Sequence, residues 1–109
     1  MSTFAEYFYT PKTPQMIIKN NEFSRQFETT VDGQLLTVEY SFQEKKIFLS
    51  KVNIPEQFEG SETMSDFLKQ ILLVAEEKKW KVVPIHPKVA AFFRKNPVYR
   101  ELLPPGIKI

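Results

Sequence analysis

Hydrophobic and polar residues alternate along the first half of the chain, which is the pattern expected of β-strands. The alternation predicts strands over residues 22–30, 34–42 and 47–54. Asp32-Gly33 is a strong signal for a tight hairpin turn, and residues 43–46 turn the chain a second time. Three strands joined by short turns predict an antiparallel meander.

The same alternation assigns side chains to the two faces of these strands. Phe23 and Phe27 are expected on one face of the first strand, beside Arg25. Phe48 and Val52 are expected on one face of the third strand. Each strand would therefore present an apolar face to a common core.

The pattern changes at residue 60, where apolar residues begin to recur at helical spacing. A helix is predicted up to residue 79, with Ser61 or Thr63 as its N-cap. A buried strand at 81–85 and a helix from Pro87 to about residue 94 follow, and then a last turn at 98–103. The fold class is a single α/β (α+β) domain, in which the long helix crosses over to a splayed parallel strand and a C-terminal helix.

The domain is expected to span residues 22–103. Residues 1–21 contain aromatic residues and prolines without clear periodicity, and they are interpreted as an N-terminal arm that packs on the domain. Residues 104–109 begin with Pro-Pro-Gly and are interpreted as a C-terminal tail.

Composition excludes several classes of function. The 109 residues contain no cysteine and one histidine, which rules out thiolate chemistry and makes a metal site improbable. The net charge of +2 comes from lysines scattered beside glutamates, so no nucleic-acid partner is expected. We find no apolar run of ~20 residues and no signal-peptide core, so we expect no membrane contact and a cytoplasmic location.

His86 is the clearest candidate for chemistry, because it directly precedes Pro87 at the predicted start of the last helix. The helix dipole disfavours the imidazolium form, and the neutral ring could act as a general base. Alternatively, the imidazole could cap the helix by a hydrogen bond to the backbone. The sequence leaves both roles open.

The segment Val82-Val83-Pro84-Ile85-His86-Pro87-Lys88-Val89-Ala90-Ala91-Phe92, followed by Arg94-Lys95-Asn96-Pro97-Val98-Tyr99, resembles the signature of short members of the GNAT superfamily of N-acetyltransferases. The resemblance covers about residues 22–103 and includes the Val31-Asp32-Gly33 hairpin. It implies acetyl-CoA as cofactor and an amine-bearing acceptor. It also implies that Tyr99 protonates the departing thiolate, although its ring could simply pack beneath the last helix.

In this family a glycine-rich loop, G-[QR]-G-x-G, holds the diphosphate of the cofactor. The matching residues here are Gly60-Ser61-Glu62-Thr63-Met64. The charge of Glu62 and the bulk of Met64 oppose a diphosphate, so weak or absent acetyl-CoA binding is expected. The cofactor-binding residues implied by the resemblance are Val52, Asn53, Ile54, Gly60, Ser61, Glu62, Thr63, Met64 and Ser65.

Two further positions differ from the family pattern. Lys51-Val52 replaces a His-Thr pair, and His86 replaces a cysteine. Two functions therefore remain: an acetyl-CoA-dependent N-acetyltransferase with His86 or a water as proton acceptor, or a non-catalytic module of the same fold that binds an altered ligand or a protein.

Overall fold

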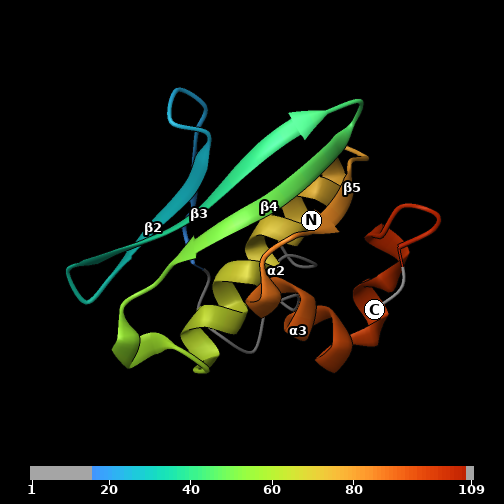
Figure 1. The fold of residues 1–109 in the computed structure, drawn as a ribbon. Helices are drawn as coiled ribbons and strands as arrows, with labels where there is room; N and C mark the ends of the chain where they lie inside the picture. Colours follow the sequence, from blue (N-terminus) through green and yellow to red (C-terminus); the bar gives the residue numbers. More distant parts are fainter. Residues whose placement is uncertain (1–15, 108–109) are drawn as a thin grey trace, which may run out of the picture.

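A computed structural model of the chain describes residues 16–107. Its sheet has five strands, arranged in the order in which they occur in the sequence (Figure 1). The first four are antiparallel, and β5 is parallel to β4. The strands are β1 (Lys19–Asn21), β2 (Gln26–Val31), β3 (Gln34–Gln43), β4 (Lys46–Asn53) and β5 (Lys81–Pro84).

Two helices lie on one side of this sheet (Figure 1). The longer helix, α2 (Glu62–Glu77), connects β4 to β5, and α3 (Pro87–Lys95) follows β5. Two short 3₁₀ turns complete the fold: η1 (Glu56–Phe58) precedes α2, and η2 (Pro97–Leu102) follows α3. The predicted fold class, an antiparallel meander with a helical crossover to a parallel strand, is confirmed.

The core lies between the sheet and α2. On the helix, apolar residues recur every three or four positions and form one buried stripe. α3 adds Val89 and Phe93, both at most 1% exposed. The side chains with at most 1% exposure are Phe27, Leu36, Val38, Ile47, Leu49 and Val82 from the sheet, and Phe67, Leu68, Ile71, Leu72 and Ala75 from α2.

Both hairpin turns of the meander form as the sequence predicts. Asp32 and Gly33 have φ angles of 52° and 76°, and Glu44 and Lys45 have φ angles of 53° and 63°. Two consecutive residues with positive φ match the twist of the flanking strands. These turns fix the register of β2 on β3 and of β3 on β4.

The prediction of a continuous strand over 22–30 is wrong in its first part. Residues 22–25 form a turn, which is stabilised by a hydrogen bond from the Ser24 N–H to the Asn21 Oδ1 (3.1 Å). Phe23 is 97% exposed, whereas Phe27 is buried. The strand starts only at Gln26, because Arg25 has a left-handed φ of 55°.

β1 lies in the segment that the sequence analysis interpreted as an N-terminal arm. Its residues pair with β2, with Lys19 opposite Glu28. Met16 and Ile18 pack against the core. The sheet therefore begins before residue 22, and the remainder of the predicted arm, residues 1–15, lies outside the described residues.

The face assignment of β4 is also corrected. Glu39 pairs with Lys51 and Tyr40 with Leu49, so Ser50 is an extra residue, a β-bulge, on β4. The bulge places Phe48 and Val52 on opposite faces, although a regular strand would put them on the same face. Ile47 and Leu49 fill the core positions instead.

β4 and β5 separate partway along β4, as expected for a splayed strand. Pairing runs from Lys46 with Lys81 to Leu49 with Pro84, and the second half of β4 has no partner in β5. The last contact is a hydrogen bond from the His86 N–H to the Leu49 carbonyl oxygen (3.0 Å). The divergence coincides with the bulge at Ser50 and with Pro84, which has no N–H to donate.

Candidate functional site

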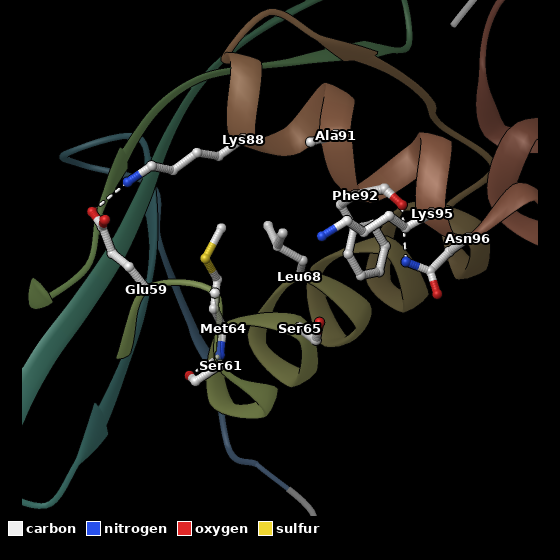
Figure 2. A pocket seen from close by; sticks show the side chains of 11 residues that line it. Glu59, Ser61, Met64, Ser65, Leu68, Lys88, Ala91, Phe92, Lys95 and Asn96 are labelled. Carbon is white, nitrogen blue, oxygen red and sulfur yellow. Dashed lines mark hydrogen bonds and ion pairs between the residues drawn. The ribbon is translucent and has the colours of Figure 1, made fainter. Parts of the chain in front are cut away.

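A pocket of about 240 Å³ lies on the helical side of the sheet (Figure 2). It is bounded by the first two turns of α2, by the residues just before α2, and by one face of α3. Its lining residues are Glu59, Gly60, Ser61, Met64, Ser65, Leu68, Lys88, Ala91, Phe92, Lys95 and Asn96.

The α2 wall of the pocket is the N-terminus of the helix. Gly60 has a φ of +71°, which only glycine adopts without strain, and it directs the chain into the helix. The Ser61 hydroxyl caps the helix by accepting a hydrogen bond from the Met64 N–H (3.4 Å), as predicted. The N–H groups of a first helical turn have no partners inside the helix, and they carry the positive end of its dipole.

Met64 forms the apolar part of this wall. Its side chain is 9% exposed and belongs to the core cluster, and its sulfur points into the space between the helices (Figure 2). Glu62 and Thr63, on the same turn, do not line the pocket. Met64 therefore occupies the pocket directly, whereas Glu62 acts on it only through its charge.

The α3 wall carries two cations. Lys88 lies in the first turn of α3 and forms an ion pair with Glu59 at one side of the pocket (Figure 2). Lys95 lies at the end of the helix, where the dipole is negative. Asn96, directly after the helix, donates a hydrogen bond to the Phe92 carbonyl oxygen (2.9 Å).

His86 is the N-cap of α3. Its Nδ1 accepts a hydrogen bond from the Lys88 N–H (3.1 Å), and Pro87 occupies the first helical position. Burial lowers the pKa of the imidazole, and the charge of Lys88 lowers it further. A neutral ring has one nitrogen lone pair in its plane, and here that lone pair accepts the backbone hydrogen bond.

Tyr99 lies behind the pocket wall. Its ring packs against Phe92, with 5.6 Å between ring centroids, and is not part of the lining. Burial raises the pKa of its hydroxyl, and so does the charge of Glu76 at the C-terminal end of α2. The pocket is formed by the opposite end of that helix.

The predicted cofactor residues are only partly brought together. Gly60, Ser61, Met64 and Ser65 line the pocket, whereas Val52, Asn53 and Ile54 do not. The Asn53 amide donates hydrogen bonds to Thr37 Oγ1 (3.1 Å) and to Glu39 Oε2 (2.8 Å) on β3.

Sequence reasoning missed the whole α3 wall. Lys88 and Lys95 are seven residues apart, with Ala91 and Phe92 between them, and this spacing places all four on one helical face. The signal was present, but the lysines were interpreted as scattered surface charges. Phe92 lines the pocket and also belongs to the buried core.

Residues 16–107 hold neither a metal site nor a membrane-spanning helix. That part of the chain contains no group of three or more histidine or acidic side chains that could hold a metal ion. None of its helices is both long and apolar enough to cross a membrane.

Comparison with known proteins identifies a family and a similar structure. Residues 26–102 match the model of a family described as GCN5-related N-acetyl-transferase. The fold is similar to the solution NMR structure of a GCN5-like N-acetyltransferase candidate from Staphylococcus aureus, with a TM-score of 0.66 and 18% sequence identity over 88% of this chain and 94% of the other. Among curated proteins, no match to the sequence was found.

Proposed function

Because this chain belongs to the family of GCN5-related N-acetyltransferases, which generally use acetyl-CoA, we propose that it binds acetyl-CoA between α2 and α3 and transfers the acetyl group to an amine. The observation that carries the proposal is the position of the pocket. Its α3 wall begins at Lys88, two residues after the His86 N–H makes the last contact between β5 and β4. A ligand in the pocket therefore has the opening between the two strands beside it.

The charges around the pocket support an anionic ligand at the start of α2. The N–H groups of the first turn and the Lys88 ammonium are hydrogen-bond donors suited to a diphosphate. Lys95 adds a second cation on the same face of α3. These groups compensate in part for the glycines that the family loop has and this chain lacks.

Three features argue that binding is weak. Glu59 and Glu62 place carboxylates near the diphosphate, and Met64 fills space that a glycine would leave open. The pocket volume is also below the range of about 300–1,000 Å³ typical of sites for drug-sized ligands. The pocket would therefore enclose only a part of acetyl-CoA.

For the transfer step, we propose that the amine attacks the thioester carbonyl, so that a C–N bond forms and the C–S bond breaks. CoA leaves as the thiolate, which takes a proton from water. A backbone N–H on the part of β4 that has no partner in β5 would polarise the carbonyl oxygen. The ammonium proton released in this step would pass to water, because the lone pair of His86 is already used in the helix cap. In this proposal His86 positions α3, and Tyr99 supports Phe92.

The proposal is tested by two measurements on the intact protein. Thermal unfolding with acetyl-CoA should show stabilisation, which amounts to about 2.7 kcal/mol at a ligand concentration of 100 Kd. Release of CoA in the presence of a panel of primary amines should then exceed release without protein. Absence of both effects at millimolar acetyl-CoA would refute the proposed function, whereas stabilisation without CoA release would indicate binding alone.

A further inference from the structure

The ion pair between Glu59 and Lys88 lies at one side of the pocket (Figure 2). Glu59 lies on the segment that leads into α2, and Lys88 lies in the first turn of α3, 29 residues later. Both residues also line the pocket. The pair therefore joins the two walls at the place where an anionic ligand would meet the N-terminus of α2.

This pair is accessible and can exchange partners. The two side chains are 37% and 43% exposed, so they remain in contact with solvent. Exposed ion pairs of this kind contribute little free energy, because water competes for both charges. A diphosphate, with its higher charge and several acceptor oxygens, is a stronger partner for an ammonium group than a single carboxylate.

Lys95 provides an internal comparison. It lines the same pocket and lies on the same helical face, two turns after Lys88. Within residues 16–107 it has no carboxylate partner, whereas Lys88 is held by Glu59. Among the described residues, an ion pair therefore restrains Lys88 but not Lys95.

We infer that Lys88 is a phosphate-binding residue of this pocket, and that Glu59 competes with the ligand for it. The ligand class is a diphosphate ester, and the inference rests on the proposed function. Binding exchanges the Glu59 carboxylate for a phosphate group on the Lys88 ammonium, so the affinity is reduced by the cost of opening the pair. Glu59 then sets how tightly the pocket holds its cofactor.

The test is a double-mutant cycle, with acetyl-CoA binding measured by calorimetry at about 0.15 M salt, where exposed charges more than about 8 Å apart are largely screened. Glu59→Gln should tighten binding about three- to tenfold, because it removes both the competitor and a repulsive charge. Lys88→Gln should weaken binding. In the Lys88→Gln background the gain from Glu59→Gln should be clearly smaller, because only the repulsive charge is then removed and there is no ammonium left to release.

Two matched controls separate this exchange from a general effect of charge. Glu56→Gln removes an exposed carboxylate three residues earlier, on η1, and should change the affinity by less than about twofold. Lys95→Gln should weaken binding but leave the gain from Glu59→Gln intact. Circular dichroism of each variant confirms that the fold is retained.

The outcomes are distinct. Equal effects of Glu59→Gln and Glu56→Gln, or an undiminished gain from Glu59→Gln in the Lys88→Gln background, would overturn the inference and leave the proposed function standing. Absence of acetyl-CoA binding in the wild-type protein and in every variant would overturn both.

Discussion

The Nδ1 atom of His86 lies 3.1 Å from the backbone nitrogen of Lys88 and accepts its hydrogen bond. This contact satisfies one of the N–H groups that the start of a helix leaves without a partner. It also holds Lys88 in the first turn, where its side chain reaches Glu59. The only histidine of the chain is therefore tied to the geometry of the pocket through the helix that it caps.

Substitution of His86 separates its two possible roles. His86→Ala should lower the free energy of unfolding by about 1 kcal/mol, because the cap is lost. His86→Asn should retain most of the stability, since asparagine is a good N-cap residue. We expect His86→Asn to retain acetyl transfer as well. Denaturant unfolding and CoA release check both points, and a large loss of rate in a stable Asn variant would identify His86 as the base.

The pKa of His86 predicts how stability depends on pH. Because burial and Lys88 lower this pKa from its usual value of 6.5, the unfolded chain binds a proton more readily than the folded one. The contribution of His86 to stability is therefore present above pH 6.5 and is lost as the pH falls through the lowered pKa. The free energy of unfolding should therefore fall as the pH is lowered from about 7.5 to about 4.5, a range that brackets the ordinary histidine pKa of about 6.5. The fall should be smaller in the His86→Asn variant. Identical profiles for the two proteins would contradict the prediction.

Tyr99 tests whether a phenol takes part in the transfer. The Tyr99 ring packs against Phe92, but Tyr99 does not line the pocket. Tyr99→Phe should therefore preserve both stability and CoA release. Tyr99→Ala should cost about 2 kcal/mol through lost aromatic packing. A Tyr99→Phe variant that folds normally but has lost activity would restore the role of general acid.

The sequence allowed the meander, the crossover helix and the last helix to be predicted, because each has a local signal. The turns at Asp32-Gly33 and residues 43–46, the apolar spacing of α2 and the His86-Pro87 helix start depend only on nearby residues. The bulge in β4 and the turn at residues 22–25 were not predicted, because they depend on tertiary contacts. Nothing local identifies Ser50 as a bulge, and the turn at 22–25 interrupts an alternation that continues in the sequence.

Only the α2 wall of the pocket could be predicted from the sequence. The family loop directs attention to residues 60–65, and four of those residues do line the pocket. The opposite wall comes from α3, and its position depends on how β5 leaves the sheet. Val52 and Asn53 lie on the part of β4 that has no partner in β5, Ile54 follows directly, and none of the three lines the pocket.

The loop before and within the first turn of α2 should limit the affinity for acetyl-CoA. Glu62→Gly with Met64→Gly should tighten binding, since it removes a charge and opens the pocket. Each glycine introduced into the helix should lower the free energy of unfolding by roughly 1 kcal/mol. Because Met64 is buried, its replacement by glycine also leaves a cavity. Met64→Gly alone should therefore lower the free energy of unfolding by about 3 kcal/mol or more. Glu62→Gln is the milder control, and binding no tighter in either variant would show that the loop is not limiting.

The most direct test of the central claim is an amide NMR titration of the intact protein with acetyl-CoA. Binding between α2 and α3 predicts chemical-shift changes at Gly60, Ser61 and Ser65 on one wall, and at Lys88 and Lys95 on the other. Amides of Ser41 and Phe48, whose side chains point to the outer face of the sheet, away from the helices, should stay unchanged. Shifts confined to that outer face, or no shifts at millimolar acetyl-CoA, would contradict the account.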